Sequence, residues 1–120
     1  MKVLGIRFCA VAEEAQPMAE FFTKGLGFPQ HDLGGSDEFR GAVIPAGDDS
    51  WIEIWEKGPD MPAGLMLQIV VDDADAVAAT ANANGVEVQG PVEAHGEKIY
   101  YASAPGDLSV SFQEILKPQK

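Results

Sequence analysis

The stretch Trp51-Ile52-Glu53-Ile54-Trp55 has the alternation of a β-strand, whose side chains point in turn to opposite faces. Ile52 and Ile54 share one face, which predicts a covering helix. Trp51, Glu53 and Trp55 share the other, so that a single carboxylate lies between two indoles. A dry core makes such a carboxylate costly, whereas a ligand cavity commonly has apolar walls and one polar anchor. Two interpretations stay open for this face: the wall of a binding cleft, or a half-exposed surface used for dimer contact.

The composition is typical of one globular domain. The chain has 120 residues, of which 46% are hydrophobic, and this is enough for a real core. No apolar run reaches the length of a membrane span, and the N-terminus has no basic segment followed by a hydrophobic one. We therefore expect a complete cytoplasmic protein with no membrane partner. The single cysteine, Cys9, excludes an internal disulfide and a cysteine-based metal cluster.

The chain is strongly acidic, with 19 acidic and 8 basic residues and a net charge of −11. This argues against nucleic acid as a partner, because its phosphates need a basic face. The charge is compatible with a cationic ligand that is attracted over long range. The simpler explanation is a surface that keeps the protein soluble.

The helix and strand patterns of the first half recur in the second. The first half predicts a strand over 4–12, a helix from Glu13 to Gly27, and strands over 28–35, 39–46 and 50–56. The second half predicts a strand over 65–71, a helix opened by Asp72-Asp73 and ended by Gly85, and strands over 86–90, 98–103 and 108–115. The two repeats cover about 1–57 and 64–116, and a segment rich in proline and glycine, 58–63, links them.

The repeat can be tested position by position. A shift of 59 residues lays the apolar positions 6, 8, 10 and 12 on positions 65, 67, 69 and 71, which are also apolar. After the helices a shift of 58 lays Ile52 on Val110 and Ile54 on Phe112. A repeat of this length indicates a duplicated supersecondary unit. The sequence predicts an α+β fold of two tandem β-α-β-β-β units, which form a curved mixed sheet around a cleft.

Short motifs add a family resemblance that covers nearly the whole chain. They are Phe21-Phe22-Thr23-Lys24-Gly25-Leu26-Gly27-Phe28 closing the first helix, Val70-Val71-Asp72-Asp73 opening the second, Gly90-Pro91, and Ala104-Pro105-Gly106-Asp107 before the last strand. With the paired units, these motifs make the chain similar to the vicinal oxygen chelate superfamily, which contains glyoxalase I, the bleomycin-resistance proteins and extradiol dioxygenases. The motifs are specific for the fold and say little about activity, since the superfamily spans several chemistries.

The resemblance also implies where a metal would bind. In metal-dependent members, one side chain from the first and last strand of each half binds a divalent ion. Those positions correspond here to Arg7, Glu53, Met66 and Ser111. Only Glu53 suits the role, because arginine stays protonated, methionine is too soft and serine is a weak neutral donor. We therefore expect no metal and no other cofactor.

The histidines, the cysteine and the tyrosines are not expected to act as catalytic groups. His31 and His95 do not share a face with Glu53 under the repeat, and we expect both on the surface. We expect Cys9 to be a small buried residue, because no histidine is placed to activate it. Tyr100 and Tyr101 are neighbours in a strand, so one should face the cleft and the other the helix side.

The two charges at the implied metal positions suggest a substitute for the ion. Arg7 and Glu53 would lie close enough to form an ion pair, which would neutralise both charges in the cavity. An outward-pointing Arg7 is the alternative.

Three functions stay open. The first is binding or sequestration of a flat small molecule, which can be cationic, in a cleft lined by Arg7, Trp51, Glu53, Trp55, Met66, Gln68, Ser111 and Gln113. The second is a glyoxalase-like lyase or isomerase, or a dioxygenase, with Glu53 as a candidate catalytic base or with an atypical divalent metal site. The third is a structural dimer without a ligand. We favour the first, and we expect a homodimer because the resemblance implies one.

Overall fold

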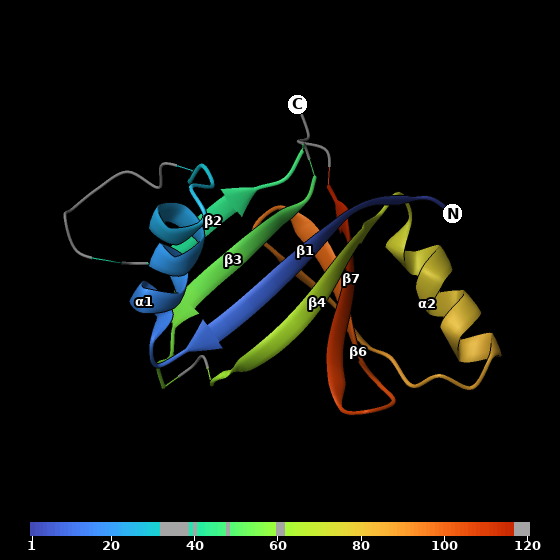
Figure 1. The fold of residues 1–120 in the computed structure, drawn as a ribbon. Coiled ribbons are helices and arrows are strands. Elements are labelled where there is room, and N and C mark those ends of the chain that lie inside the picture. Colours follow the sequence, from blue (N-terminus) through green and yellow to red (C-terminus); the bar gives the residue numbers. More distant parts are fainter. Residues whose placement is uncertain (32–38, 40, 48, 60–61, 117–120) are drawn as a thin grey trace. The chain divides into compact units, whose positions relative to one another are not determined.

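The computed structural model describes residues 1–31, 39, 41–47, 49–59 and 62–116 (Figure 1). In chain order these residues form β1 (Val3–Ala12), α1 (Ala15–Glu20), a π-helical turn η1 (Phe21–Gly25), β2 (Ala42–Pro45), β3 (Trp51–Glu56), β4 (Gly64–Val71), α2 (Ala74–Ala83), β5 (Gln89–Ala94), β6 (Glu97–Ala104) and β7 (Leu108–Ile115). The fold class is α+β, as predicted. No helix in the described residues is long and apolar enough to cross a membrane.

The chain forms two compact units. The continuous unit is Arg7–Leu65, and the discontinuous unit is Met1–Ile6 together with the chain from Met66 onward. The boundary between Leu65 and Met66 falls near the start of β4, just beyond the predicted linker.

In the continuous unit β3 is the central strand. It pairs in parallel with β1 and antiparallel with β2. Helix α1 covers one face of these strands, where Ala15 and Ala19 pack against a cluster that includes Ile44 and the fully buried Ile54. The helix-covered isoleucine face that the alternation of β3 predicts is therefore confirmed.

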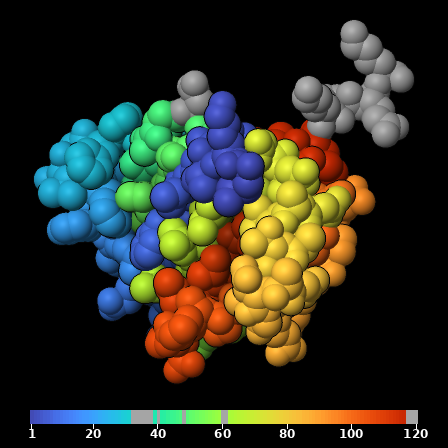
Figure 2. Space-filling model, turned by 90° about the vertical axis from the view of Figure 1, so that its right-hand side faces the viewer, coloured from blue at the N-terminus to red at the C-terminus, as the bar shows by residue number. Residues whose placement is uncertain are grey.

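In the discontinuous unit β7 pairs in parallel with β4 and antiparallel with β6, and β6 pairs antiparallel with β5. Helix α2 packs on one face through Ala74 and Ala78, against a cluster that includes the stacked rings of Tyr100 and Phe112, whose centroids are 5.3 Å apart. In Figure 2 this helix, in yellow, forms much of the surface that faces the viewer.

The start of α2 is held by two carboxylates. Asp73 is the N-cap residue, and its Oδ1 accepts a hydrogen bond from the backbone N of Ala76 at 3.1 Å. Glu114 of β7 accepts one from the backbone N of Ala74 at 2.9 Å. Both satisfy N–H groups that have no partner within the helix.

The strand registers of the two units are equivalent. Arg7 lies level with Trp51 in the β1–β3 pair, and Met66 lies level with Ser109 in the β4–β7 pair. These pairs are related by the shifts of 59 and 58 residues that the sequence comparison gave. The same supersecondary unit is thus built twice.

Some predicted boundaries are wrong. The first helix is shorter than expected, because after α1 the chain widens into η1, where Leu26 N donates to Phe21 O at 2.9 Å. The predicted strand over 28–35 is irregular over 28–31, and its remainder lies outside the described residues. The predicted strand over 39–46 is confined to β2. The strand predicted over 86–90 begins only at Gln89, since pairing with β6 starts where Gln89 lies level with Tyr101.

Candidate functional site

One candidate site is the face of β3 that points away from α1. Trp51, Glu53 and Trp55 lie there as the alternation predicts, and all three are half-buried. Arg7 of β1 is level with Trp51 and only 4% exposed. Its guanidinium carbon lies 3.8 Å from the centroid of the Trp51 ring, which is the geometry of a cation–π contact. We call these four residues the tryptophan face.

The carboxylate of this face is held by its neighbour on the same strand. Trp55 Nε1 donates a hydrogen bond to Glu53 Oε1 at 3.1 Å. The second oxygen, Oε2, accepts no hydrogen bond from the described residues. The bond fixes one oxygen of the carboxylate and leaves the other oxygen for a ligand.

The predicted ion pair between Arg7 and Glu53 needs correction. Arg7, among its other contacts, lies over Trp51, and Glu53 accepts from Trp55. Within the described residues of this unit, the indoles hold these two charges and no direct ion pair joins them. The physical reason is register: Arg7 is level with Trp51, whereas Cys9 is level with Glu53.

Gly41 shapes the same face. A Cβ atom at this position would lie 2.1 Å from Cε3 of Trp55, far inside van der Waals contact. Its φ of +143° also lies in the region that favours glycine. Gly41 therefore lets the Trp55 ring lie against the backbone before β2, the position from which its N–H reaches Glu53.

Cys9 faces this site as an inert thiol. Burial, and then the negative charge of Glu53, raise the pKa of Cys9 to about 11. The thiol is therefore protonated at neutral pH and a poor nucleophile.

The discontinuous unit has a buried polar network. Ser111 Oγ donates to Gln113 Oε1 at 2.8 Å, and Gln113 Nε2 donates to Gln68 Oε1 at 3.4 Å and to Glu97 Oε1 at 3.2 Å. Ser111 and Gln113 are 1% and 3% exposed. The network satisfies polar atoms that burial would otherwise leave unpaired. Of the residues predicted to contact a ligand, these two are therefore beneath the surface, whereas Gln68 and Met66 are half-buried.

Glu97 is a member of this network that the sequence analysis missed. The signal was available, because Glu97, Ile99 and Tyr101 alternate along β6 and so share a face. On that face Tyr101 lies level with Ser111, and Ile99 with Gln113.

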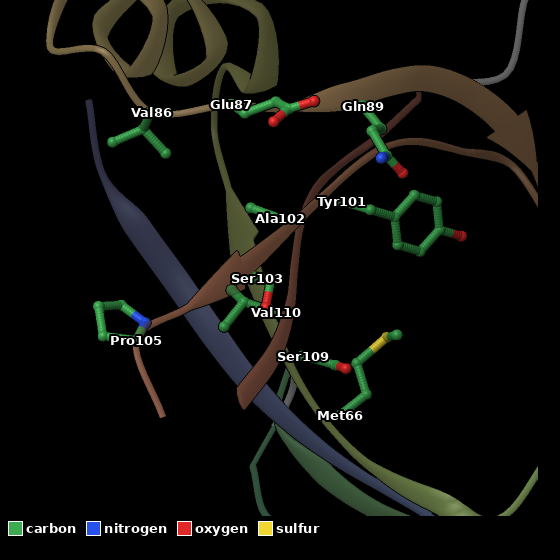
Figure 3. A pocket seen from close by; sticks show the side chains of 10 residues that line it. All are labelled: Met66, Val86, Glu87, Gln89, Tyr101, Ala102, Ser103, Pro105, Ser109 and Val110. Carbon is green, nitrogen blue, oxygen red and sulfur yellow. The ribbon is translucent and has the colours of Figure 1, made fainter. Parts of the chain in front are cut away.

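A pocket of about 520 Å³ lies in the discontinuous unit (Figure 3). Its polar wall comes from β5, β6, β7 and the segment before β5, and comprises Glu87, Gln89, Tyr101, Ser103 and Ser109, with Met66 of β4 beside it. Tyr101 lines this pocket, and Tyr100 packs under α2. The prediction that the two tyrosines face opposite sides is confirmed.

The residues at the implied metal positions do not fit a divalent ion. Arg7 is a cation stacked on an indole, Met66 offers only a thioether, and Ser111 directs its proton to Gln113. Glu53 is the one carboxylate of the set. The described residues contain no group of three or more His, Cys, Asp or Glu side chains placed to hold a metal.

Neither histidine belongs to the tryptophan face or to the lining of the pocket. His31 is exposed, and its backbone N donates to Val43 O at 2.8 Å. His95 is exposed in the β5–β6 turn, where its φ is 53°. The surface location predicted for both is confirmed.

Solved structures share this architecture over almost the whole chain. A Legionella pneumophila protein described as an NAD-dependent benzaldehyde dehydrogenase gives a TM-score of 0.67 at 11% identity, and covers 92% of this chain and 98% of its own. A hypothetical protein from Bacillus halodurans gives 0.66 at 19% identity, with 99% and 97% covered. Methylmalonyl-CoA epimerase from Streptomyces coelicolor, in complex with 2-nitronate-propionyl-CoA, gives 0.65 at 17% identity, with 98% and 99% covered.

The chain has the vicinal oxygen chelate fold. The fold that the sequence motifs implied is therefore confirmed. No family model matches the sequence, and no curated protein matches it. At these identities the vicinal oxygen chelate fold is what the solved structures establish for this chain, and the activity has to be argued from its own side chains.

Proposed function

We propose that the protein binds a flat small molecule that carries a positive charge, through the tryptophan face and without a metal. The observation that carries this proposal is the half-buried Glu53 between two indoles, with one carboxylate oxygen not engaged by the described residues. Indole rings offer flat apolar surface for stacking, and the carboxylate offers a counter-charge.

The distribution of charge on this face supports a cation. Arg7 is buried against Trp51, so its charge is directed inward, whereas Glu53 is accessible. The net charge of −11 would add long-range attraction for a cation. A CoA ester such as those bound by the epimerases carries several phosphates, and the tryptophan face offers only a buried arginine to meet them.

A pair of probes of the same shape tests the charge preference. N-methylacridinium is a planar cation and acridine is its neutral counterpart. Binding is measured by quenching of tryptophan fluorescence, since both tryptophans of the chain lie on this face. We expect the cation to bind more tightly, and Glu53→Gln to lower its affinity about tenfold, which is about 1.4 kcal/mol.

The matched control is Glu56→Gln, which removes an exposed carboxylate from the other face of the same strand. This variant should bind both probes as the unmodified protein does. Equal affinity for the two probes, or an affinity for the cation that Glu53→Gln leaves unchanged, would contradict the proposal.

A second candidate is an isomerase in which Glu53 removes a proton from carbon next to a carbonyl. One oxygen of Glu53 is held by Trp55, and the other, which no described residue engages, can accept such a proton. One structural neighbour is a methylmalonyl-CoA epimerase in complex with methylmalonyl-CoA. Incubation of this protein with methylmalonyl-CoA in D₂O separates the two candidates: deuterium uptake that Glu53→Gln abolishes would support the isomerase, and binding alone predicts none.

A further inference from the structure

We propose that the pocket of the discontinuous unit is a second binding site, which takes a neutral sugar-like ring bearing hydroxyl and amide groups. This goes beyond the function proposed above, because the pocket contains no residue of the tryptophan face. Its volume of about 520 Å³ is in the range of small-molecule sites, roughly 300–1,000 Å³.

The side chains around the pocket lie on two faces of the strands. Tyr101 and Ser103 alternate with Ala102 along β6, and Tyr100 of the same strand packs under α2. Tyr101 and Ser103 therefore point away from α2, and Ala102 points toward it. In Figure 3 Gln89, Tyr101, Met66 and Ser109 surround the open space on one side of β6. This is the part of the pocket that we assign to the ligand.

The chemistry of that wall fits groups that both donate and accept hydrogen bonds. The hydroxyls of Tyr101, Ser103 and Ser109 can do both, and the carboxamide of Gln89 has a donor and an acceptor end. Ligand hydroxyls and amides have the same double character. The half-exposed ring of Tyr101 and the thioether of Met66 add apolar surface for the C–H face of a ring.

Charge excludes the anionic ligands of similar size. Among the described residues that line the pocket, Glu87 is the only charged one, and none is basic. Lys98 of β6 donates to Asp75 Oδ2 at 2.9 Å on the α2 side, where Tyr100 also donates to Asp75. A phosphate or carboxylate in the pocket would meet no counter-charge and one repelling carboxylate.

The buried network holds this wall in place. Tyr101 is level with Ser111, whose hydroxyl is fixed by Gln113. Support of this kind limits the movement of the strand that presents Tyr101, and a preorganised site binds at a lower entropic cost.

The test is an NMR titration of the ¹⁵N-labelled full-length protein with N-acetylglucosamine, and separately with N-acetylglucosamine 6-phosphate. We expect the neutral sugar to shift the amide signals of Gln89, Tyr101 and Ser109, and the phosphate to bind more weakly. Tyr101→Ala should lower the affinity about tenfold, and Tyr101→Phe should lower it less because the ring is kept. The amide spectrum of each variant shows directly whether it is folded.

Glu93→Gln on the exposed side of β5 is the control and should bind the sugar as before. If Tyr101→Ala fails to fold, Ser109→Val, which fills the pocket wall with an apolar group, replaces it and should reduce binding in the same way. Absence of shifts at the three amides, equal affinity for the phosphorylated sugar, or unchanged affinity in the wall variants would overturn the proposal. The acridinium titration reports on different residues, so either proposal can fail while the other stands.

Discussion

Replacement of Gln113 by leucine should destabilise the protein far more than the same replacement of a surface glutamine. Gln113 is 3% exposed, and its carboxamide is bonded to Ser111, Gln68 and Glu97. Leucine has a similar size but no polar atom. The Ser111 hydroxyl, which is 1% exposed, would then lose its acceptor in a place that water does not reach.

The magnitude follows from two terms. A buried hydroxyl left without a partner costs about 1–3 kcal/mol, and loss of a hydrogen bond to a charged group costs about 1.5–3 kcal/mol. Greater burial of apolar surface by leucine offsets part of this, so we expect a net loss of about 3 kcal/mol. Ser111→Ala alone should cost about 1–3 kcal/mol, because it leaves the buried Oε1 of Gln113 without its donor.

The assay is urea unfolding followed by far-ultraviolet circular dichroism, with Gln16→Leu on the exposed side of α1 as the matched control. The control should change stability by less than about 0.5 kcal/mol. The double variant Ser111→Ala/Gln113→Leu should be more stable than Gln113→Leu alone by about 1–3 kcal/mol, since no hydroxyl is left unpaired. Costs that add within about 0.5 kcal/mol would refute the network, because they would show that the two residues do not interact.

Three further predictions follow from contacts on other faces. The bonds from Tyr100 and Lys98 hold the pKa of Asp75 below its ordinary value of 3.8, and the bond to Asp75 raises the pKa of Tyr100 above 10.0 and that of Lys98 above 10.5. These contacts contribute stability at pH values between the pKa of Asp75 and those of Tyr100 and Lys98. The contribution is lost as the pH falls through the lowered pKa of Asp75, and again as the pH rises through the raised pKa values of Tyr100 and Lys98. Asp75→Asn should therefore flatten both arms of a plot of melting temperature against pH. Gly41→Ala should cost about 2 kcal/mol or more through overpacking against Trp55, and should shift the tryptophan emission maximum. We also propose a homodimer, the state that the family resemblance implies, and sedimentation velocity should show a species with the mass of two chains.

Local sequence patterns were sufficient for the faces of the strands and for the start of the second helix. Alternation along β3 placed Ile54 under a helix and Glu53 on the opposite face, because the two-residue period of a strand depends on nothing else in the fold. Asp73 was recognisable as a helix start, since its side chain satisfies a backbone N–H of its own helix. The strand predicted over 108–115 has the same bounds as β7.

Features that depend on pairing between distant segments were not predictable in this way. The contact of Arg7 with Trp51 follows from the β1–β3 register, which alternation does not determine. The start of β5 depends on where β6 offers a partner, so the predicted strand over 86–90 begins too early. The pocket combines side chains of several segments that are far apart in the sequence, and the sequence predicts only the faces of the individual strands.

The division of the chain also constrains the order in which it can fold during synthesis. Lys2 N donates to Asp72 Oδ1 at 2.9 Å, and Asp72 N donates to Lys2 O at 3.1 Å, so Lys2 leaves the ribosome 70 positions before its partner. The N–H of Ala74 waits for Glu114 in the last strand. Within the unit between Arg7 and Leu65 the wait is shorter than that of Lys2, since Glu13 meets its partner, Lys57, 44 positions later. Translation therefore completes the segment Arg7–Leu65 before the discontinuous unit, which is complete only when β7 has been made.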